Sequence, residues 1–252
     1  MPYVRARGTS RAFFRDRPWF LLGGSGLAAM AGFINVCVLS FTVVPASHVT
    51  GAVSQLSADV FSGGGEAFTL MVAAVAAFLA GGVASGAIIG STHLKPGRRY
   101  GVVLMAEGVL LALATVLLMQ RSGIGVAMAA AACGMQNAMA SSYYGLVVRT
   151  THMTGIVTDI GVLIGHWLRY RRASLWKLGF LTALLVSFFG GGVFAAIAVR
   201  GIGVAALALP AIVCVAGGAT YYTWRHRLLE KAQLQKQPAR PARKISASAP
   251  VD

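Results

Sequence analysis

Six apolar runs of about 20 residues dominate this sequence, and each could cross the roughly 30 Å hydrocarbon core of a bilayer as one helix. Of all residues, 56% are hydrophobic and 12% are charged, a balance that excludes an ordinary water-soluble domain. We therefore expect an all-α integral membrane protein. Its expected transmembrane helices are residues 19–44, 67–90, 101–120, 124–148, 178–199 and 202–222.

The segments between these helices differ sharply in positive charge. The N-terminal lead, the second and fourth connections and the C-terminal tail together carry 19 lysine and arginine residues, whereas the loops on the other side carry two. Because cytoplasmic segments are enriched in these residues, both termini are expected in the cytoplasm. The formal net charge of +15 thus reflects orientation and contact with membrane lipid, and no nucleic-acid-binding motif accompanies it.

The sequence contains an internal duplication, because three short motifs return in the same order and at nearly constant separation. Each copy holds three expected helices, an odd number, so the second copy must enter the membrane from the opposite side. We therefore predict two inverted three-helix repeats, residues 19–120 and 124–223. The paired motifs are GFIN (32–35) with GMQN (134–137), SHVTG (47–51) with THMTG (151–155), and FLAGGV (78–83) with FFGGGV (188–193).

Shorter segments interrupt and flank the repeats. After its second motif each copy has an apolar segment too short to span, 52–61 and 155–168, which we expect to form interrupted or re-entrant helices. Residues 1–18 form a basic cytoplasmic lead. Residues 224–252, rich in Lys, Arg, Gln, Pro and Ser, are expected to be a disordered cytoplasmic tail.

Polar side chains gather at the duplicated second motif. Thr50 and Thr154 each precede a glycine where a short helix begins, so their hydroxyls either cap the free amides or join an electropositive helix end that holds an anion. His48 and His152 occupy matched positions and titrate near neutrality, which suits proton coupling or ligand contact. Simple packing near the membrane surface is the alternative for both histidines.

Further polar residues lie inside the expected helices or just beyond a break. Asn35, Gln136 and Asn137 either hydrogen-bond between helices or face a central cavity. Asp159 lies one turn after the second break, and an ionisable group at membrane depth points to function by default.

Glu107 is the one acid within its expected helix. We expect it to be largely neutral unless it meets Arg149, because burial disfavours a charged carboxylate while a nearby cation favours it. A transport role and a structural hydrogen bond or ion pair both stay open for this residue.

Catalytic and metal-binding patterns are missing from the sequence. Cys37, Cys133 and Cys214 are isolated, without the spacing of a zinc site or a disulfide framework. The chain has no Walker loop, dinucleotide fingerprint, serine-nucleophile elbow or His-Glu-x-x-His motif. We therefore expect no metal, no cofactor and no enzymatic activity.

The paired motifs, extended by HMTGIVTD at 152–159, resemble the signatures of the YoaK family, bacterial integral membrane proteins defined as a domain of unknown function. The resemblance covers about residues 20–222. It implies six spans in the bacterial cytoplasmic (inner) membrane and no established activity. Asn35 stands where an Asp is common in this family, which argues against a mechanism that needs an acid there.

These features favour a secondary transporter or permease for an unidentified small solute, bound at the interface of the two repeats. An anion is one candidate solute, and homo-oligomerisation is left open. The alternatives are a non-transporting assembly or scaffold protein, which a dry contact between the two breaks would favour, and a membrane enzyme acting on lipid. The expected binding residues are Asn35, His48, Thr50, Gln136, Asn137, His152, Thr154 and Asp159, and the proton-coupling candidates are Glu107, Asp159 and His152.

Overall fold

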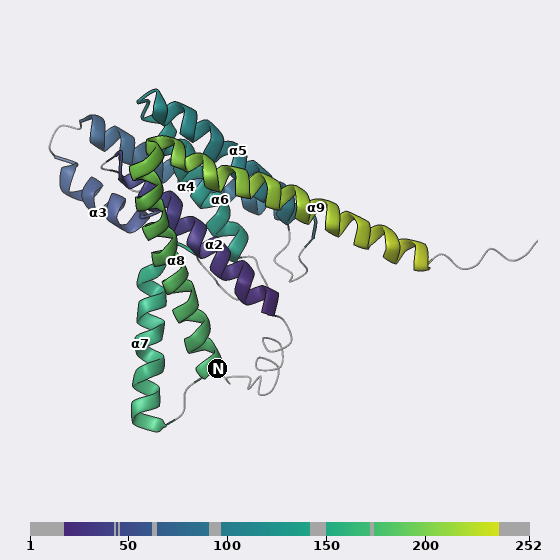
Figure 1. The fold of residues 1–252 in the computed structure, drawn as a ribbon. Coiled ribbons are helices and arrows are strands. Elements are labelled where there is room, and N and C mark those ends of the chain that lie inside the picture. Colours follow the sequence, from purple (N-terminus) through teal and green to yellow (C-terminus); the bar gives the residue numbers. More distant parts are fainter. Residues whose placement is uncertain are drawn as a thin grey trace, which may run out of the picture.

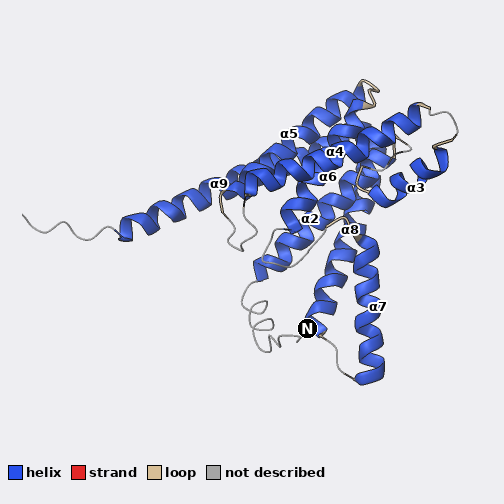
Figure 2. Ribbon diagram, turned by 180° about the vertical axis from the view of Figure 1, so that it is seen from behind, coloured by secondary structure: helices blue, strands red, loops and turns tan. Residues whose placement is uncertain are grey.

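The computed structural model describes residues 18–42, 44, 46–61, 65–90, 97–141, 150–171 and 174–236, and the regular structure in these ranges is helical. Figure 1 shows the helices in chain order, and Figure 2 shows the same arrangement from behind. The predicted all-α class is confirmed. The helices are α2 (Pro18–Leu39), α3 (Val49–Asp59), α4 (Glu66–Ile89), α5 (Arg99–Met119), α6 (Ile124–Ser141), α7 (Met153–Tyr170), α8 (Leu175–Ile202), the 3-10 helix η1 (Gly203–Leu207) and α9 (Ala208–Lys236).

Four helical stretches in the described ranges are long and apolar enough to cross a membrane by length and composition. They are those of a multi-pass membrane protein. The first three are Leu21–Leu39, Glu66–Ile89 and Arg99–Met119, and the fourth, Leu175–Glu230, runs for 56 residues through α8, η1 and α9. The apolar stretch Ile124–Ala140 in α6 is shorter.

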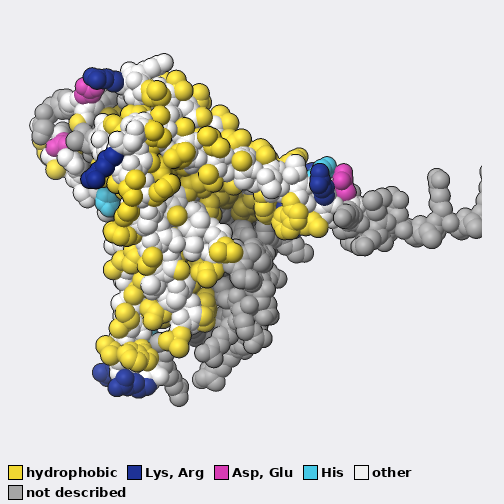
Figure 3. Space-filling model, viewed as in Figure 1, with side chains coloured by type: hydrophobic (Ala, Val, Ile, Leu, Met, Phe, Trp, Pro, Cys, Tyr) yellow, Lys and Arg dark blue, Asp and Glu magenta, His cyan; other side chains and the backbone are white. Residues whose placement is uncertain are grey.

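The surface of the bundle agrees with a lipid environment. Large apolar side chains are exposed along the helices, among them Leu79, Val83, Phe189 and Ile197. Figure 3 shows hydrophobic side chains over the body of the molecule, whereas the coloured charged side chains lie at its extremities. A continuous apolar surface of this kind would be costly in water and is favourable against acyl chains.

One helix ends earlier than the sequence pattern predicts, and the predicted end of another lies outside the described residues. α2 ends at Leu39 instead of reaching residue 44, and the hydroxyls of Ser40 and Thr42 donate hydrogen bonds to the carbonyl oxygens of Val36 (2.8 Å) and Val38 (3.0 Å). These bonds satisfy carbonyl groups that the end of a helix leaves free. Helix four was expected to reach residue 148, and α6 is described as far as Ser141.

The last helix is longer than predicted and begins irregularly. The 3-10 helix η1 lies just before α9, and Pro210, the third residue of α9, cannot donate a main-chain hydrogen bond. At the other end α9 continues to Lys236, although disorder was expected from residue 224. His226 and Glu230 form an i, i+4 pair at 3.3 Å there, a contact that supports an exposed helix.

Helices of the two predicted copies pack at very close range. A Cβ atom added to Gly32 in α2 would collide with the carbonyl group of Phe188 in α8, and one added to Gly191 in α8 would collide with that of Ala29 in α2. Only glycine permits main chains to approach in this way.

The same pair of contacts recurs between α4 and α6. A Cβ atom on Gly134 would meet the carbonyl group of Phe78, and one on Gly81 would meet that of Ala131. These four positions are the sequence equivalents of the four in the contact between α2 and α8.

α5 and α9 make a third reciprocal contact. Gly108 faces the carbonyl oxygen of Ala211 at 2.7 Å from its would-be Cβ, and Gly218 faces that of Gly101, also at 2.7 Å. Gly101 and Ala211 are equivalent positions of the two copies, and so are Gly108 and Gly218. The two halves of this contact are therefore equivalent. Each long helix of one copy therefore has its main partner in the other copy.

The two short helices pack in a matching way. α3 lies against α4 and α7 lies against α8, and each of these partners is the helix that follows in the chain. The chain enters them through His48 (φ −94°, ψ 64°) and His152 (φ −89°, ψ 62°), which have almost the same backbone conformation.

Candidate functional site

The histidine of each duplicated break stands at the N-cap of a short helix. A Cβ atom on Gly51 would collide with the ring of His48, and a Cβ atom on Gly155 would collide with the ring of His152. The glycine of each motif therefore makes room for an imidazole ring that lies on the first helical turn. Neither histidine makes a side-chain capping hydrogen bond.

The threonines of the same motifs lie within the helices. Thr50 and Thr154 are the second residues of α3 and α7, and both are exposed. Asp159, further along α7, is also exposed. α7 meets α8 through an apolar side that includes Ile156 and Ile160, and the threonine and the aspartate are not part of that contact.

Asn35 holds the first break in place. Its side-chain oxygen accepts hydrogen bonds from the hydroxyl of Ser47 (2.9 Å) and from the main-chain N–H of Ser47 (3.3 Å). Ser47 is buried and directly precedes His48. The contact ties α2 to the segment that starts α3, which is the structural alternative considered for this asparagine.

Gln136 joins the two copies deep inside the bundle. It is fully buried, and its Nε2 donates a hydrogen bond to the carbonyl oxygen of Leu27 in α2 (3.3 Å). Its Oε1 has no hydrogen-bond partner in the described part of the chain. Asn137, the next residue, is half-buried in the same helix.

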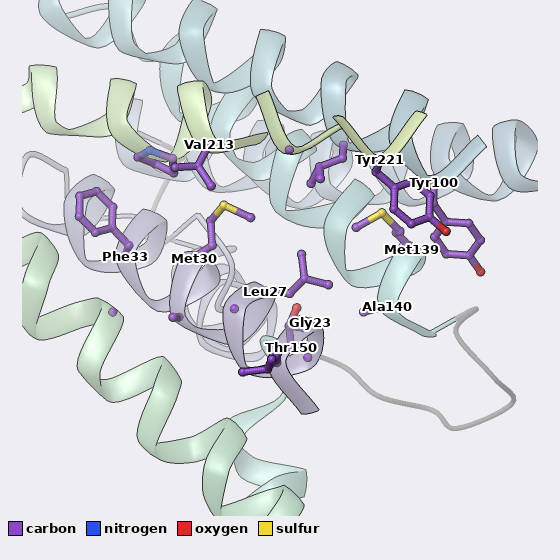
Figure 4. A pocket seen from close by; sticks show the side chains of 18 of the residues that line it. Gly23, Leu27, Met30, Phe33, Tyr100, Met139, Ala140, Thr150, Val213 and Tyr221 are labelled. Atoms are coloured by element: carbon purple, nitrogen blue, oxygen red, sulfur yellow. The ribbon is translucent and has the colours of Figure 1, made fainter. Parts of the chain in front are cut away.

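A cavity of about 540 Å³ lies beside Leu27. Figure 4 shows it between α2, α5, α6 and α9, with α8 completing the wall. Its wall is almost wholly apolar, formed for example by Met30, Phe33, Met139 and Val213. No lysine, arginine, aspartate or glutamate of the described residues lines it.

The polar exception in the middle of this wall is Thr150. This residue is fully buried, and its Oγ1 has no hydrogen-bond partner among the residues that the structure describes. Figure 4 shows the hydroxyl directed toward Leu27, and two tyrosines, Tyr100 and Tyr221, stand at the far end of the cavity. A buried hydroxyl without a partner costs free energy, so its place at a cavity calls for an explanation.

None of the residues predicted for the site lines this cavity. Gln136 reaches its wall indirectly, through the hydrogen bond to Leu27. Thr150 was missed because it precedes the duplicated motif instead of lying in it. A comparison of the two copies could have singled it out, since its equivalent in the first copy is Ala46.

Glu107 occupies a separate position in α5. It is fully buried, and neither of its carboxyl oxygens has a hydrogen-bond partner in the described ranges. Cys133 of α6 and Cys214 of α9 lie near the carboxyl group. Arg149, the predicted partner, lies outside the described residues, so the expected ion pair stays a prediction.

Comparison with protein families gives one match, which spans most of the chain. The model of a family described as "Protein of unknown function (DUF1275)" matches residues 24–220. Neither the curated proteins nor the solved structures give a match. The matched region begins inside α2 and ends inside α9, so it includes most of the residues that line the cavity, but not Leu22, Gly23 and Tyr221.

Proposed function

The chain belongs to the DUF1275 family, whose function is unknown, and from the site described above we propose that the protein is a secondary transporter or permease for a small solute. The resemblance to the YoaK family is part of this proposal. The observation that carries it is the cavity beside Thr150, with one buried hydroxyl and an otherwise apolar wall.

The size of the cavity supports a binding site. Ligand pockets commonly have volumes of about 300–1,000 Å³, and the cavity of about 540 Å³ lies within this range. The cavity is open to the outside of the bundle, since Leu22, Phe194 and Val213 in its wall are more than half exposed. A site of this size that a solute can reach supports transport over the scaffold alternative.

Six spans are part of the proposal. The stretch Leu175–Glu230 has 56 residues and would be about 84 Å long as one straight helix at about 1.5 Å per residue, far beyond a hydrocarbon core of about 30 Å. Two spans, α8 and α9, accommodate it. α6, with 18 residues, is near the lower limit of about 17 for a single span.

An inverted repeat explains the reciprocal contacts between the copies. A twofold axis in the membrane plane would exchange α2 with α6, α4 with α8 and α5 with α9. It would then carry the contact of α2 with α8 onto that of α6 with α4, and the contact of α5 with α9 onto itself. These are the equivalences seen at Gly32, Gly134, Gly101 and Gly218.

The distribution of lysine and arginine residues indicates on which side of the membrane the cavity lies. With both termini in the cytoplasm, the first residues of α2, α5 and α8 and the distal part of α9 lie at the cytoplasmic face. Leu22, Tyr100, Phe180 and Tyr221 line the cavity near these ends. In this proposal the cavity is the cytoplasmic part of the transport path and belongs to an inward-facing state.

The wall of the cavity limits the chemistry of the solute. An apolar wall with one central hydroxyl fits a small, mostly hydrophobic molecule that carries one or two hydrogen-bonding groups. An anion, considered from the sequence, gains no support here, since no cationic side chain of the described ranges lines the cavity. His152, Thr154 and Asp159 stay candidates for coupling at the second break.

A thermal-shift screen of small amphiphilic molecules against the purified protein tests this function. A ligand that binds the native state raises the melting temperature, and above Kd the stabilisation grows with the logarithm of the ligand concentration. Gly26 lines the cavity and has open space at its Cβ position, so Gly26→Trp should fill the site and abolish the shift. Gly165→Trp is the matched control, because Gly165 has equally open space but lies on α7, away from the cavity.

A hit that shifts wild type and Gly165→Trp but not Gly26→Trp supports the site. Such a hit should then be taken up by proteoliposomes that contain wild-type protein. Equal shifts in all three proteins would place the ligand elsewhere, and a library of several hundred compounds without one site-dependent hit would argue against a solute-binding cavity.

A further inference from the structure

The cavity has an equivalent region in the other half of the molecule, and that region is closed. Positions of α2 correspond to positions of α6, and positions of α5 correspond to those of α9, as the paired motifs and contacts require. The lining residues Leu27, Met30, Met139, Thr150, Val213 and Tyr221 correspond to Ala129, Ala132, Cys37, Ala46, Val103 and Leu111. Each of these six counterparts is at most 3% exposed, so the region that they form is closed.

Side-chain size does not explain this difference. The hollow region holds the larger side chains, for example Leu27 and Met30, whereas their counterparts Ala129 and Ala132 lie in the packed core. If the helices were arranged alike on both sides, the smaller residues would leave the larger space. The helices must therefore stand further apart around the cavity than around its counterpart.

Glu107 belongs to the closed region. Its equivalent in α9 is Gly217, which lines the open cavity. By this correspondence the carboxyl group faces the place where an equivalent cavity would form. Its two oxygen atoms, buried and without a described hydrogen-bond partner, would then meet water and solute.

From this asymmetry we infer that a second cavity, with Glu107 in its wall, opens between α2, α4, α5, α6 and α9 when the observed cavity closes. It is the outward-facing form of the same transport site and takes the same solute. The inference rests on the proposed function, and the two cavities alternate because each needs the spacing that the other excludes.

Native cysteines report on this second cavity. Cys37 and Cys214 correspond to Met139 and Leu104, which line the open cavity, so both should become accessible when the counterpart opens. Cys133 lies near the carboxyl group of Glu107 and should become accessible with them, so the control is a cysteine introduced at Ala195, which is fully buried and whose equivalent, Ser85, does not line the open cavity. All three thiols are buried in the present state.

The experiment is to treat the purified Ala195→Cys protein with N-ethylmaleimide and to follow each cysteine by mass spectrometry of its peptide. Cys37 and Cys214 should react at least tenfold faster than the cysteine at position 195. A sample unfolded in denaturant, in which these cysteines should react at similar rates, shows that the difference comes from the native structure. If the cysteine at position 195 keeps pace with the other two in the native protein, the exposure is global unfolding and the inference fails.

A second variant tests alternation. Gly26→Trp wedges the observed cavity open, so the rate at Cys37 should fall at least fivefold, while Gly165→Trp should leave it unchanged. An unchanged rate in Gly26→Trp, or no reaction of Cys37 in wild type during several hours, would overturn the second cavity. Labelling needs no solute, so such a result would leave binding to the observed cavity standing, and failure of the solute screen would leave the labelling result standing.

Discussion

The side-chain oxygen of Asn35 accepts two hydrogen bonds from Ser47, one from the hydroxyl (2.9 Å) and one from the main-chain N–H (3.3 Å). This contact fixes the angle at which the chain leaves α2 and approaches α3. An aspartate in place of the asparagine could accept both bonds, whereas an aliphatic residue could accept neither.

We therefore expect Asn35→Ala to lower the free energy of unfolding by about 1–3 kcal/mol, the usual consequence of leaving buried donors unpaired. Asn35→Asp should stay within about 1 kcal/mol of wild type, because the carboxylate keeps both acceptors. Thermal unfolding of the purified variants measures the difference. Equal losses in both variants would show that the hydrogen bonds to Ser47 are not what Asn35 contributes.

The glycines at the reciprocal contacts should tolerate no side chain. Gly134→Ala would push a methyl group into the carbonyl group of Phe78, so we expect a loss of about 1–3 kcal/mol or more from overpacking. Gly86→Ala is the matched control, since Gly86 is a helical glycine of α4 with open space at its Cβ position. Melting temperatures compare the two, and a control that loses as much as Gly134→Ala would refute the close-contact explanation.

Glu107→Gln should fold as well as wild type. An ionised carboxylate without a partner in an apolar interior costs several kcal/mol, so the neutral acid is the form that fits this burial, and glutamine resembles it in shape. Expression level and melting temperature provide the measurement. If Glu107→Gln is lost from the membrane and the double variant with Arg149→Gln is restored, an ion pair is present and the neutral acid is wrong.

The proposed orientation predicts which positions face the cell exterior. Single cysteines at Gly65, Arg121 and Arg200 should react with an impermeant thiol reagent in intact cells, and one at Arg98 should react only after the cells are lysed. The native cysteines are buried and can be replaced by alanine for this purpose. Labelling at Arg98 together with protection at Arg121 would reverse the orientation and make the observed cavity the outward-facing one.

The second break can be tested without disturbing the bundle. Asp159 is exposed on α7, so Asp159→Asn should keep the wild-type melting temperature and, if the residue takes part in coupling, should abolish solute uptake. Asp59→Asn in the first copy is the control, expected to keep both properties. Unchanged uptake in Asp159→Asn would remove this residue from the transport path.

The elements that could be predicted from the sequence are those set by local pattern. The long apolar runs place α2, α4, α5 and α8 within a few residues, because each must bury its main-chain polar groups in lipid. The duplicated motifs contain Gly32 and Gly134, but the close contacts that these glycines make were found only in the structure.

The cavity could not be predicted from such patterns. Its wall is assembled from separate helices. In the sequence, Met30 and Val213 cannot be distinguished from any other apolar residue of a membrane-spanning helix. Whether such residues meet or leave a space depends on how far apart the helices stand. The same limit explains why Thr150 was missed, since its burial and its open hydroxyl are properties of the assembled bundle.

Glu107 has a glycine as its equivalent, Gly217, so only one of the two halves carries an ionisable group at this position. In the proposed transport cycle, a carboxyl group that meets water in one form alone makes the rate of that half of the cycle depend on the acidity of one compartment. The direction of net transport is set by the gradients of the solute and of any ion that moves with it, and not by this asymmetry. The unmatched side chain thus gives one face of the membrane a pH response that the other face lacks.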